Sequence, residues 1–226
     1  MLVQKSYSKF MGEVDKMFKI SAVWHDIKGT SRLIGVALII FAVSVYIGIT
    51  NDNFAFYLST QLDAMRDVVS KIDESSNPTL ATFLFIFFNN AIKCVLVIFL
   101  GAFFGIFPIF FLSINGLIIG YVVKLTLDGQ SAVSTFDLVV KLLLPHGILE
   151  IPALIIVTAY GLRLGKLLYS TMGALLTNHD KLDPIGAKYK ETLKRCGVMA
   201  VYATVTLFIA AIIESTFTQW LATTIN

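Results

Sequence analysis

The sequence predicts an all-α membrane protein, a bundle of about five transmembrane helices. Of the 226 residues, 56% are hydrophobic and only 15% are charged, whereas soluble domains are about 45–50% apolar and about 25% charged. The mean hydropathy is +0.78. Several apolar stretches reach the roughly 20 residues that a helix needs to cross the hydrocarbon core of a bilayer. The length suits one membrane domain without a sizeable soluble core.

Charge and cysteine content argue against other classes. The net charge of +3 is small, and no patch of basic and aromatic residues indicates a nucleic-acid partner. Cys94 and Cys196 lie in or beside apolar stretches, so we expect packing residues rather than a disulfide or a metal pair. About 30 mostly polar residues precede the first apolar stretch, which is typical of a signal-anchor helix and not of a cleavable signal peptide. No cofactor is expected.

The N-terminal arm, residues 1–31, precedes the first predicted span at 32–50. Its lysines are interleaved with apolar residues such as Phe18 and Trp24. This pattern is typical of an amphipathic helix on the cytoplasmic leaflet, with Trp24 at the level of the headgroups. The insert at 51–78 is acidic and its apolar residues recur every three or four positions, so we expect an amphipathic helix outside the membrane.

The second and third spans come from one apolar block, 79–127. As a single helix it would be about 70 Å long at 1.5 Å per residue, which is more than twice the hydrocarbon core. The chain must therefore fold back, and Gly101, Gly105 and Pro108 mark the natural turn. This predicts spans at 79–100 and 105–127.

Pro145 divides the next helical stretch. A proline disfavours helical geometry at the residue before it and suits the first turn of a new helix. We therefore expect a short interfacial or re-entrant helix at 136–144 and a fourth span at 145–163. A basic loop over 175–195 then leads to the fifth span at 196–218.

The distribution of lysine and arginine predicts the orientation. The N-terminal arm and the segment after the fourth span hold most of the basic residues, whereas the loops at 51–78 and 128–135 are acidic or neutral. Five spans with the N-terminus in the cytoplasm and the C-terminus outside place both basic segments on the cytoplasmic side. The chain is thus divided into a cytoplasmic arm, 1–31, and a multi-pass domain of the cell membrane, 32–226.

Polar side chains inside apolar spans are expensive and are therefore candidates for function. His146 and Glu150 stand four residues apart, on one face of the fourth span. The helical rise places both in the outer half of the membrane, with polar residues of other spans near its middle. The candidate polar column consists of Asn89, Asn90, Lys93, Asn115, His146, Glu150 and Glu214.

Four roles stay open for this column: it locks helices together, forms a proton or ion site, binds a metal, or lines a cleft for a partner. A zinc enzyme normally needs three protein ligands. His25 and His179 are predicted on the cytoplasmic side, so no third histidine is available at the depth of His146 and Glu150. The sequence therefore does not indicate catalysis. Glycines spaced by four residues are typical of helix-packing surfaces. These glycines are Gly101 with Gly105, Gly116 with Gly120, and Gly161 with Gly165.

Together these residues resemble the stage II sporulation protein M family of integral membrane proteins. The ordered set is Asn89-Asn90, then Gly101, Gly105 and Pro108, then Asn115-Gly116 and Gly120, then Pro145-His146-Gly147, Glu150 and Pro152, then Gly161 and Gly165. The resemblance covers residues 80–170 well and the remainder loosely, and the Pro-His-Gly-x-x-Glu run is its most specific element. The long acidic insert at 51–78 departs from the family pattern.

The resemblance implies a multi-spanning scaffold without enzymatic activity. The bacterial protein for which the family is named looks like a bridge that holds cell-wall hydrolases together at the engulfing septum membrane, but the family extends beyond spore formers. We therefore expect a scaffold or assembly protein whose partners are the lipid bilayer, other membrane or cell-envelope proteins, or a second copy of the chain. The alternatives are a permease or channel subunit built around the polar column and an intramembrane metal-dependent hydrolase at His146 and Glu150.

Overall fold

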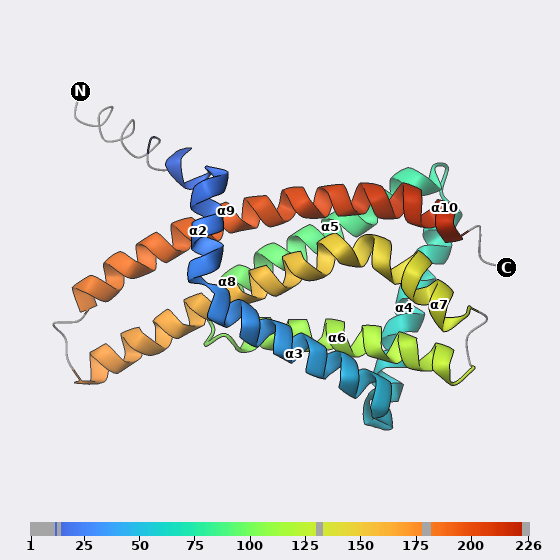
Figure 1. Ribbon diagram of the computed structural model, residues 1–226, viewed down its shortest axis with the longest axis horizontal. Helices are drawn as coiled ribbons and strands as arrows, with labels where there is room; N and C mark the ends of the chain where they lie inside the picture. The colour runs from blue at the N-terminus through green and yellow to red at the C-terminus, as the bar shows by residue number, and fades with distance from the viewer. Residues whose placement is uncertain (1–11, 13–14, 130–132, 178–181, 223–226) are drawn as a thin grey trace.

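The computed structural model describes residues 12, 15–129, 133–177 and 182–222, and every regular element in these ranges is helical. Five helices are long and apolar enough to cross a membrane, which confirms the predicted fold class. They are α3 (Ser31–Thr50), α5 (Pro78–Leu100), α6 (Ile106–Leu127), α8 (Leu144–Thr177) and α9 (Leu182–Ile213). These helices run lengthwise through the molecule and alternate in direction, so α2 (Ile20–Gly29) and α10 (Gln219–Ala222) lie at opposite ends (Figure 1).

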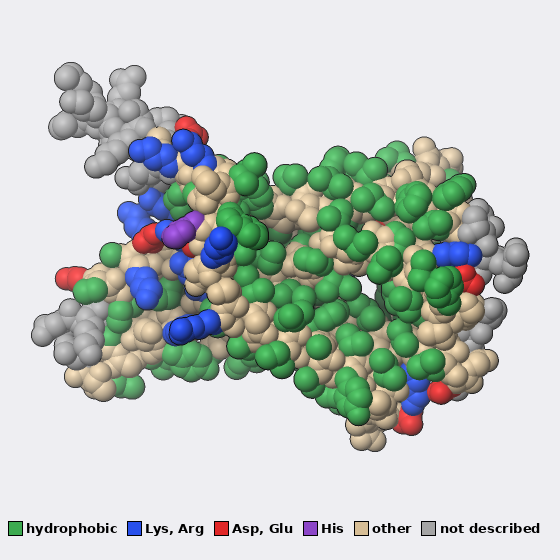
Figure 2. All heavy atoms as spheres, in the orientation of Figure 1, with side chains coloured by type: hydrophobic (Ala, Val, Ile, Leu, Met, Phe, Trp, Pro, Cys, Tyr) green, Lys and Arg blue, Asp and Glu red, His purple; other side chains and the backbone are tan. Residues whose placement is uncertain are grey.

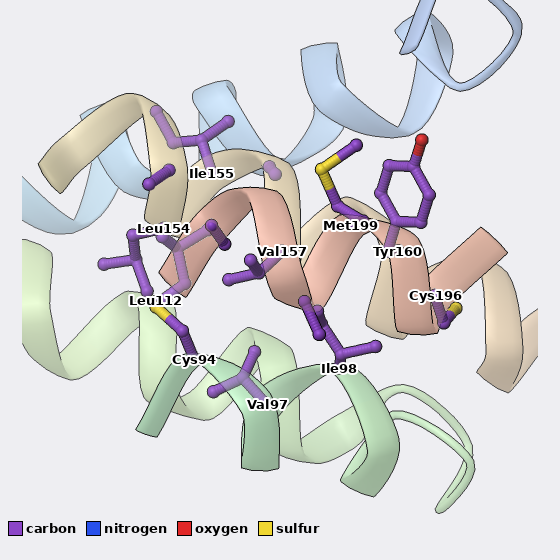
Figure 3. Close-up of a cluster of buried hydrophobic side chains, with 14 of the residues drawn as sticks. Cys94, Val97, Ile98, Leu112, Leu154, Ile155, Val157, Tyr160, Cys196 and Met199 are labelled. Carbon is purple, nitrogen blue, oxygen red and sulfur yellow. The ribbon is translucent and has the colours of Figure 1, made fainter. Parts of the chain in front are cut away.

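Helix α8 lies at the centre of the bundle. It packs against α3, α5, α6 and α9, and its most apolar stretch is the most buried of the five. Figure 3 shows Val157 and Tyr160 of α8 among core side chains of α5, α6 and α9. Many large apolar side chains on the outer surface are exposed, as expected of helices that face lipid tails (Figure 2). The side chains that α8 carries are therefore positioned by all four other spans.

The predicted turn between the second and third spans is present. The chain reverses between α5 and α6, where Phe104 and Gly105 have left-handed backbones with φ of 57° and 71°. Glycine adopts this conformation readily. The ring of Phe104 packs on Tyr169 of α8, with 4.9 Å between ring centroids. The amide of Gly105 donates to the carbonyl of Gly101 over 2.8 Å, so the turn is tight.

The insert at 51–78 contains helix α4 (Ala55–Asp73). Helix α4 crosses one end of the bundle at a steep angle to the spans (Figure 1). Within α4, Leu58 is fully buried, whereas most of the other residues are exposed or half-buried. An ion pair between Lys124 of α6 and Asp52 connects the start of the insert to the end of α6.

The sequence predicts a helix break before Pro145, but the helix continues through this position. Helix α7 (Thr135–Asp137) continues through a π-helical segment, η2 (Leu138–Leu143), directly into α8. Leu144 keeps helical backbone angles, φ −65° and ψ −45°, and its amide donates to the carbonyl of Val139, five residues earlier. A π turn widens the helix without ending it. The segment at 136–144 is thus helical but is joined to the fourth span.

The fourth and fifth spanning helices are longer than predicted. Helix α8 has 34 residues and α9 has 32, or about 50 Å each at 1.5 Å per residue, so both exceed the roughly 30 Å hydrocarbon core. Most of the expected basic loop over 175–195 is therefore helical. The joined ends of α8 and α9 project beyond the other spans (Figure 1). At its other end α9 continues into a π-helical segment, η4 (Glu214–Thr218).

Helix α2 is the longest described helix of the N-terminal arm, residues 15–17 are also helical, and residues 1–11, 13 and 14 lie outside the described residues. It runs across α8 and α9 rather than along them (Figure 1). Val23 is buried against the bundle, while Trp24 is exposed, with the Lys28 ammonium 5.4 Å from the centroid of its ring. The Tyr202 hydroxyl of α9 donates to the carbonyl of Phe18 over 2.6 Å. The arm therefore packs on the bundle through this segment.

Candidate functional site

Part of the predicted polar column meets at one small cavity inside the bundle. Asn90 and Lys93 of α5, Asn115 of α6 and Glu150 of α8 line it, together with Cys94, Phe111 and Leu154. The cavity offers about 10 Å³ of room to a water-sized sphere, which is about what one water molecule needs. Side chains from three spans thus converge on a space too small for an organic solute.

The interactions of this cluster are mostly local. The Asn89 amide donates to the Asn90 side chain over 3.1 Å, and the Asn115 amide donates to the carbonyl of Phe111 over 2.8 Å. Both hydrogen bonds stay within one helix, so neither of them joins two spans. Within this cluster, Lys93 of α5 and Glu150 of α8 attract each other through their opposite charges.

Two described members of the predicted column, Asn89 and Glu214, do not line the cavity. The side-chain amide of Asn89 donates a hydrogen bond to the side chain of Asn90. Glu214 belongs to η4, which packs against α5 and α8. The side chain of His146 lies outside the described part of the structure. Among the described residues, no three His, Cys, Asp or Glu side chains are grouped closely enough to hold a metal ion.

Glycines bring the spans that carry this cluster into backbone contact. A Cβ on Gly161 of α8 would lie 2.6 Å from Cγ of Pro108, and one on Gly165 would lie 2.5 Å from the amide nitrogen of Gly105. On the other side of α6, a Cβ on Gly116 would lie 2.7 Å from Cβ of Ser44 in α3. Real Cβ atoms do not approach this closely, so only glycine fits at these three positions. Gly101 and Gly120 face backbone atoms of Gly161 and Val45 at similarly close range.

A second polar cluster, which sequence reasoning missed, joins α2 to α8 and α9. The carboxylate of Asp26 accepts hydrogen bonds from the Tyr160 hydroxyl at 2.6 Å, from Arg163 at 3.0 Å and from Arg195 at 2.5 Å. Arg163 also donates to the hydroxyl of Thr30 over 3.2 Å. Figure 3 shows the Tyr160 hydroxyl pointing away from the other side chains drawn. We call these residues the Asp26 network.

The charge state of Asp26 follows from this environment. Burial alone raises the pKa of the Asp26 carboxyl, but hydrogen bonds from Tyr160 and Arg163 and the charges of Arg163 and Arg195 outweigh it, so the net pKa lies below its usual value. Only 11% of the Asp26 side chain is exposed. A buried carboxylate is stable only when it is paired and hydrogen-bonded, and Asp26 meets that condition through two arginines and a tyrosine.

The sequence held one weak signal for the Asp26 network. Asp26 is the single acidic residue between Lys19 and Arg32. An isolated carboxylate in a basic amphipathic segment indicates a specific cationic partner, but its partners lie more than 130 positions away. Their identity required the crossing of α2 over α8 and α9.

Fold and clusters together define a multi-pass helical membrane protein whose spans are joined by glycine contacts and which carries polar clusters within the bundle and at one end. The sequence model of the stage II sporulation protein M family matches residues 33–219. The chain therefore belongs to this family, which confirms the resemblance noted in its sequence. No curated protein and no solved structure matches the chain.

Proposed function

We propose that this family member is a non-enzymatic membrane scaffold that assembles with other membrane or cell-envelope proteins. The observation that carries the proposal is the size of the central cavity. Polar side chains of α5, α6 and α8 converge, yet the space between them holds about one water molecule. Backbone contacts at the glycines close the bundle around it. Such an interior suits a rigid bundle better than a route for a solute.

Two segments outside the packed bundle offer surfaces for partners. Helix α4 lies across one end, where the side chain of Phe56 is 87% exposed. The joined ends of α8 and α9 extend beyond the other spans at the opposite end (Figure 1). In the orientation that we propose, with the N-terminus inside, α4 faces the cell envelope and the α8–α9 projection faces the cytoplasm.

Glu150→Gln tests whether the central cluster locks the scaffold. The substitution removes the charge that acts on Lys93. We expect a loss of about 1–3 kcal/mol in the free energy of unfolding, measured as a lower melting temperature in mild detergent. Proteins crosslinked to the wild type in native membranes should be recovered in reduced amounts. Glu74→Gln, at an exposed position after α4, is the matched control and should change neither measurement.

The proposal fails if Glu150→Gln keeps both the melting temperature and the full set of crosslinked proteins. Wild-type protein in liposomes should also conduct no protons or small ions above protein-free liposomes. A flux that Glu150→Gln abolishes would instead assign the cluster to transport.

A permease or channel subunit is the second candidate, and the π-helical segments favour it. Such segments are frequent at functional sites. Here η2 runs directly into α8, the helix that carries Glu150, and η4 packs against α8. Lys93 and Glu150 could pass a proton along α5 and α8 when the bundle opens. The flux measurement on wild-type protein separates this candidate from the scaffold.

A further inference from the structure

A basic cleft lies where α2, α3, α8 and α9 meet, on the side of α2 that faces the start of α3. The volume of the cleft is about 550 Å³. Its cationic lining residues are Lys28, Arg32, Arg163, Lys166 and Lys188. No carboxylate is among the described residues that line it. Figure 2 shows lysine and arginine side chains gathered at this end of the molecule.

Carboxylates in the described part of the chain do not neutralise most of this positive charge. Within the described residues, Asp26 pairs with Arg163 and Arg195, and Glu191 pairs with Arg195. These two carboxylates balance the two arginines. Arg32, Lys166 and Lys188 are exposed and form no ion pair with the described part of the chain. The cleft therefore has a net positive charge that an anion would offset.

The Asp26 network prepares one cation of the cleft for an anion. Asp26 and Thr30 hold Arg163 by one of its terminal nitrogens, and its side chain is 26% exposed. An arginine whose side chain is already ordered loses less freedom when it binds an anion. Ser31 adds an exposed hydroxyl to the lining, whereas the hydroxyls of Thr30 and Ser170 already donate to the carbonyls of Asp26 and Lys166. Arginine, lysine and hydroxyl donors are the groups that bind phosphate oxygens.

The position of the cleft suits a lipid headgroup. Its rim includes Ser31, where the apolar helix α3 begins, and Arg163, which follows the apolar part of α8. The cleft thus lies at the boundary between the apolar spans and the charged end of the molecule. Basic pockets between transmembrane helices at this depth fit the headgroups of anionic lipids.

We propose that this cleft binds the phosphate group of an anionic membrane lipid, such as phosphatidylglycerol. This goes beyond the scaffold role and does not depend on it. The lipid would bridge α2, α3, α8 and α9, because its phosphate accepts hydrogen bonds from residues of all four. Binding would fix the arm against the bundle in membranes that contain anionic lipid.

Lipid binding to the purified full-length protein tests the proposal. In an uncharged detergent, the protein is titrated with dioleoylphosphatidylglycerol or with dioleoylphosphatidylcholine, and bound lipids are counted by native mass spectrometry. We expect the wild type to prefer phosphatidylglycerol. The double variant Lys166→Gln/Lys188→Gln should bind phosphatidylglycerol about tenfold or more weakly, since each cation near a membrane surface contributes measurably to anionic lipid binding.

The control is Lys71→Gln/Lys190→Gln, which removes the same charge from exposed positions that do not line the cleft. Equal losses in both double variants would reduce the effect to net charge and overturn the proposal, as would equal binding of phosphatidylcholine. Displacement of the lipid by millimolar inorganic phosphate would assign the cleft to free phosphate and overturn the lipid assignment. If the cleft double variant does not fold, Arg32→Gln provides the same measurement at one exposed residue.

Discussion

At the scale of single residues, the two polar clusters differ in how they are satisfied. Asp26 accepts three hydrogen bonds from groups on two other helices. At the central cavity, Asn115 forms a hydrogen bond within its own helix, and so does Asn89, which precedes the lining residue Asn90. The Asp26 network therefore contributes more to holding the arm on the bundle than Asn89 and Asn115 contribute to holding the spans together.

Asp26→Asn should lower the stability of the folded protein by about 2 kcal/mol, because hydrogen bonds to charged groups are among the stronger ones. The effect should depend on pH. The folded pKa of Asp26 lies below the usual aspartate value of 3.8, so its stabilising contribution is complete above 3.8 and is lost as the pH falls through the lower folded pKa.

Melting temperatures of wild type and Asp26→Asn in detergent measure this contribution. The two should differ at pH 7 and converge only as the pH falls through the folded pKa of Asp26, which lies below 3.8. Asp63→Asn is the control, because Asp63 pairs with Arg66 on an exposed helix face, and its effect should stay within about 0.5 kcal/mol. A constant gap between wild type and Asp26→Asn across the pH range would show that the charge of Asp26 is not what stabilises the fold.

At the scale of helices, glycine contacts set the spacing of the bundle. Gly105 and Gly165 join the α5–α6 turn to α8, and Gly116 joins α6 to α3. In lipid, helices associate through close packing rather than through the hydrophobic effect, and small residues permit that packing. These contacts explain how the spans can pack in one arrangement although, among the described residues, Asn89 and Asn115 bond within their own helices.

Gly161→Ala should destabilise the protein by about 1–3 kcal/mol, because the added methyl group would collide with Pro108 and with the carbonyl of Val97. Gly173→Ala is a matched control in the same helix, with no atom within 4 Å of the added Cβ. It should stabilise by about 0.5–1 kcal/mol, since alanine is the better helix former. Thermal unfolding in detergent compares the two, and equal effects would contradict tight packing at Gly161.

At the scale of the whole molecule, charge separates the two ends of the bundle. The basic cleft and the Asp26 network lie at the end with α2, and α4 lies at the other. From the positive-inside rule we propose an orientation with the α2 end in the cytoplasm. The scaffold proposal uses this orientation, because it decides which surface meets envelope proteins.

Cysteine labelling checks the orientation. In intact cells, a membrane-impermeant maleimide should label Thr60→Cys on α4, and should label Ser170→Cys on α8 only after the membrane is permeabilised. Both positions are exposed, whereas the native Cys94 and Cys196 are buried. The reverse pattern would show that the protein has the opposite orientation in the membrane. Labelling of both positions in intact cells would contradict an odd number of spans between residues 60 and 170.

Much of the architecture was accessible from the sequence, but helix ends were not. The turn at Gly101–Gly105 followed from helix length against bilayer thickness. The continuity of η2 through Pro145 did not, because a π turn depends on hydrogen bonds between residues five apart and has no clear sequence pattern. The extensions of α8 and α9 were also missed, because a basic segment can be either a loop or a helix outside the membrane.

The sequence by itself determined the class, the five spans and the family, because apolar length and local spacing decide these within single segments. It also placed Asn90, Lys93, Asn115 and Glu150 at compatible depths, and these four do line one cavity. Only the tertiary structure decided that the cavity is nearly filled, that Asp26 pairs with Arg163 and Arg195, and that five cations share one cleft. The cavity arises where α5, α6 and α8 pack together, whereas the ion pairs and the cleft arise where α2 crosses α8 and α9. Such crossings depend on packing between segments far apart in the sequence.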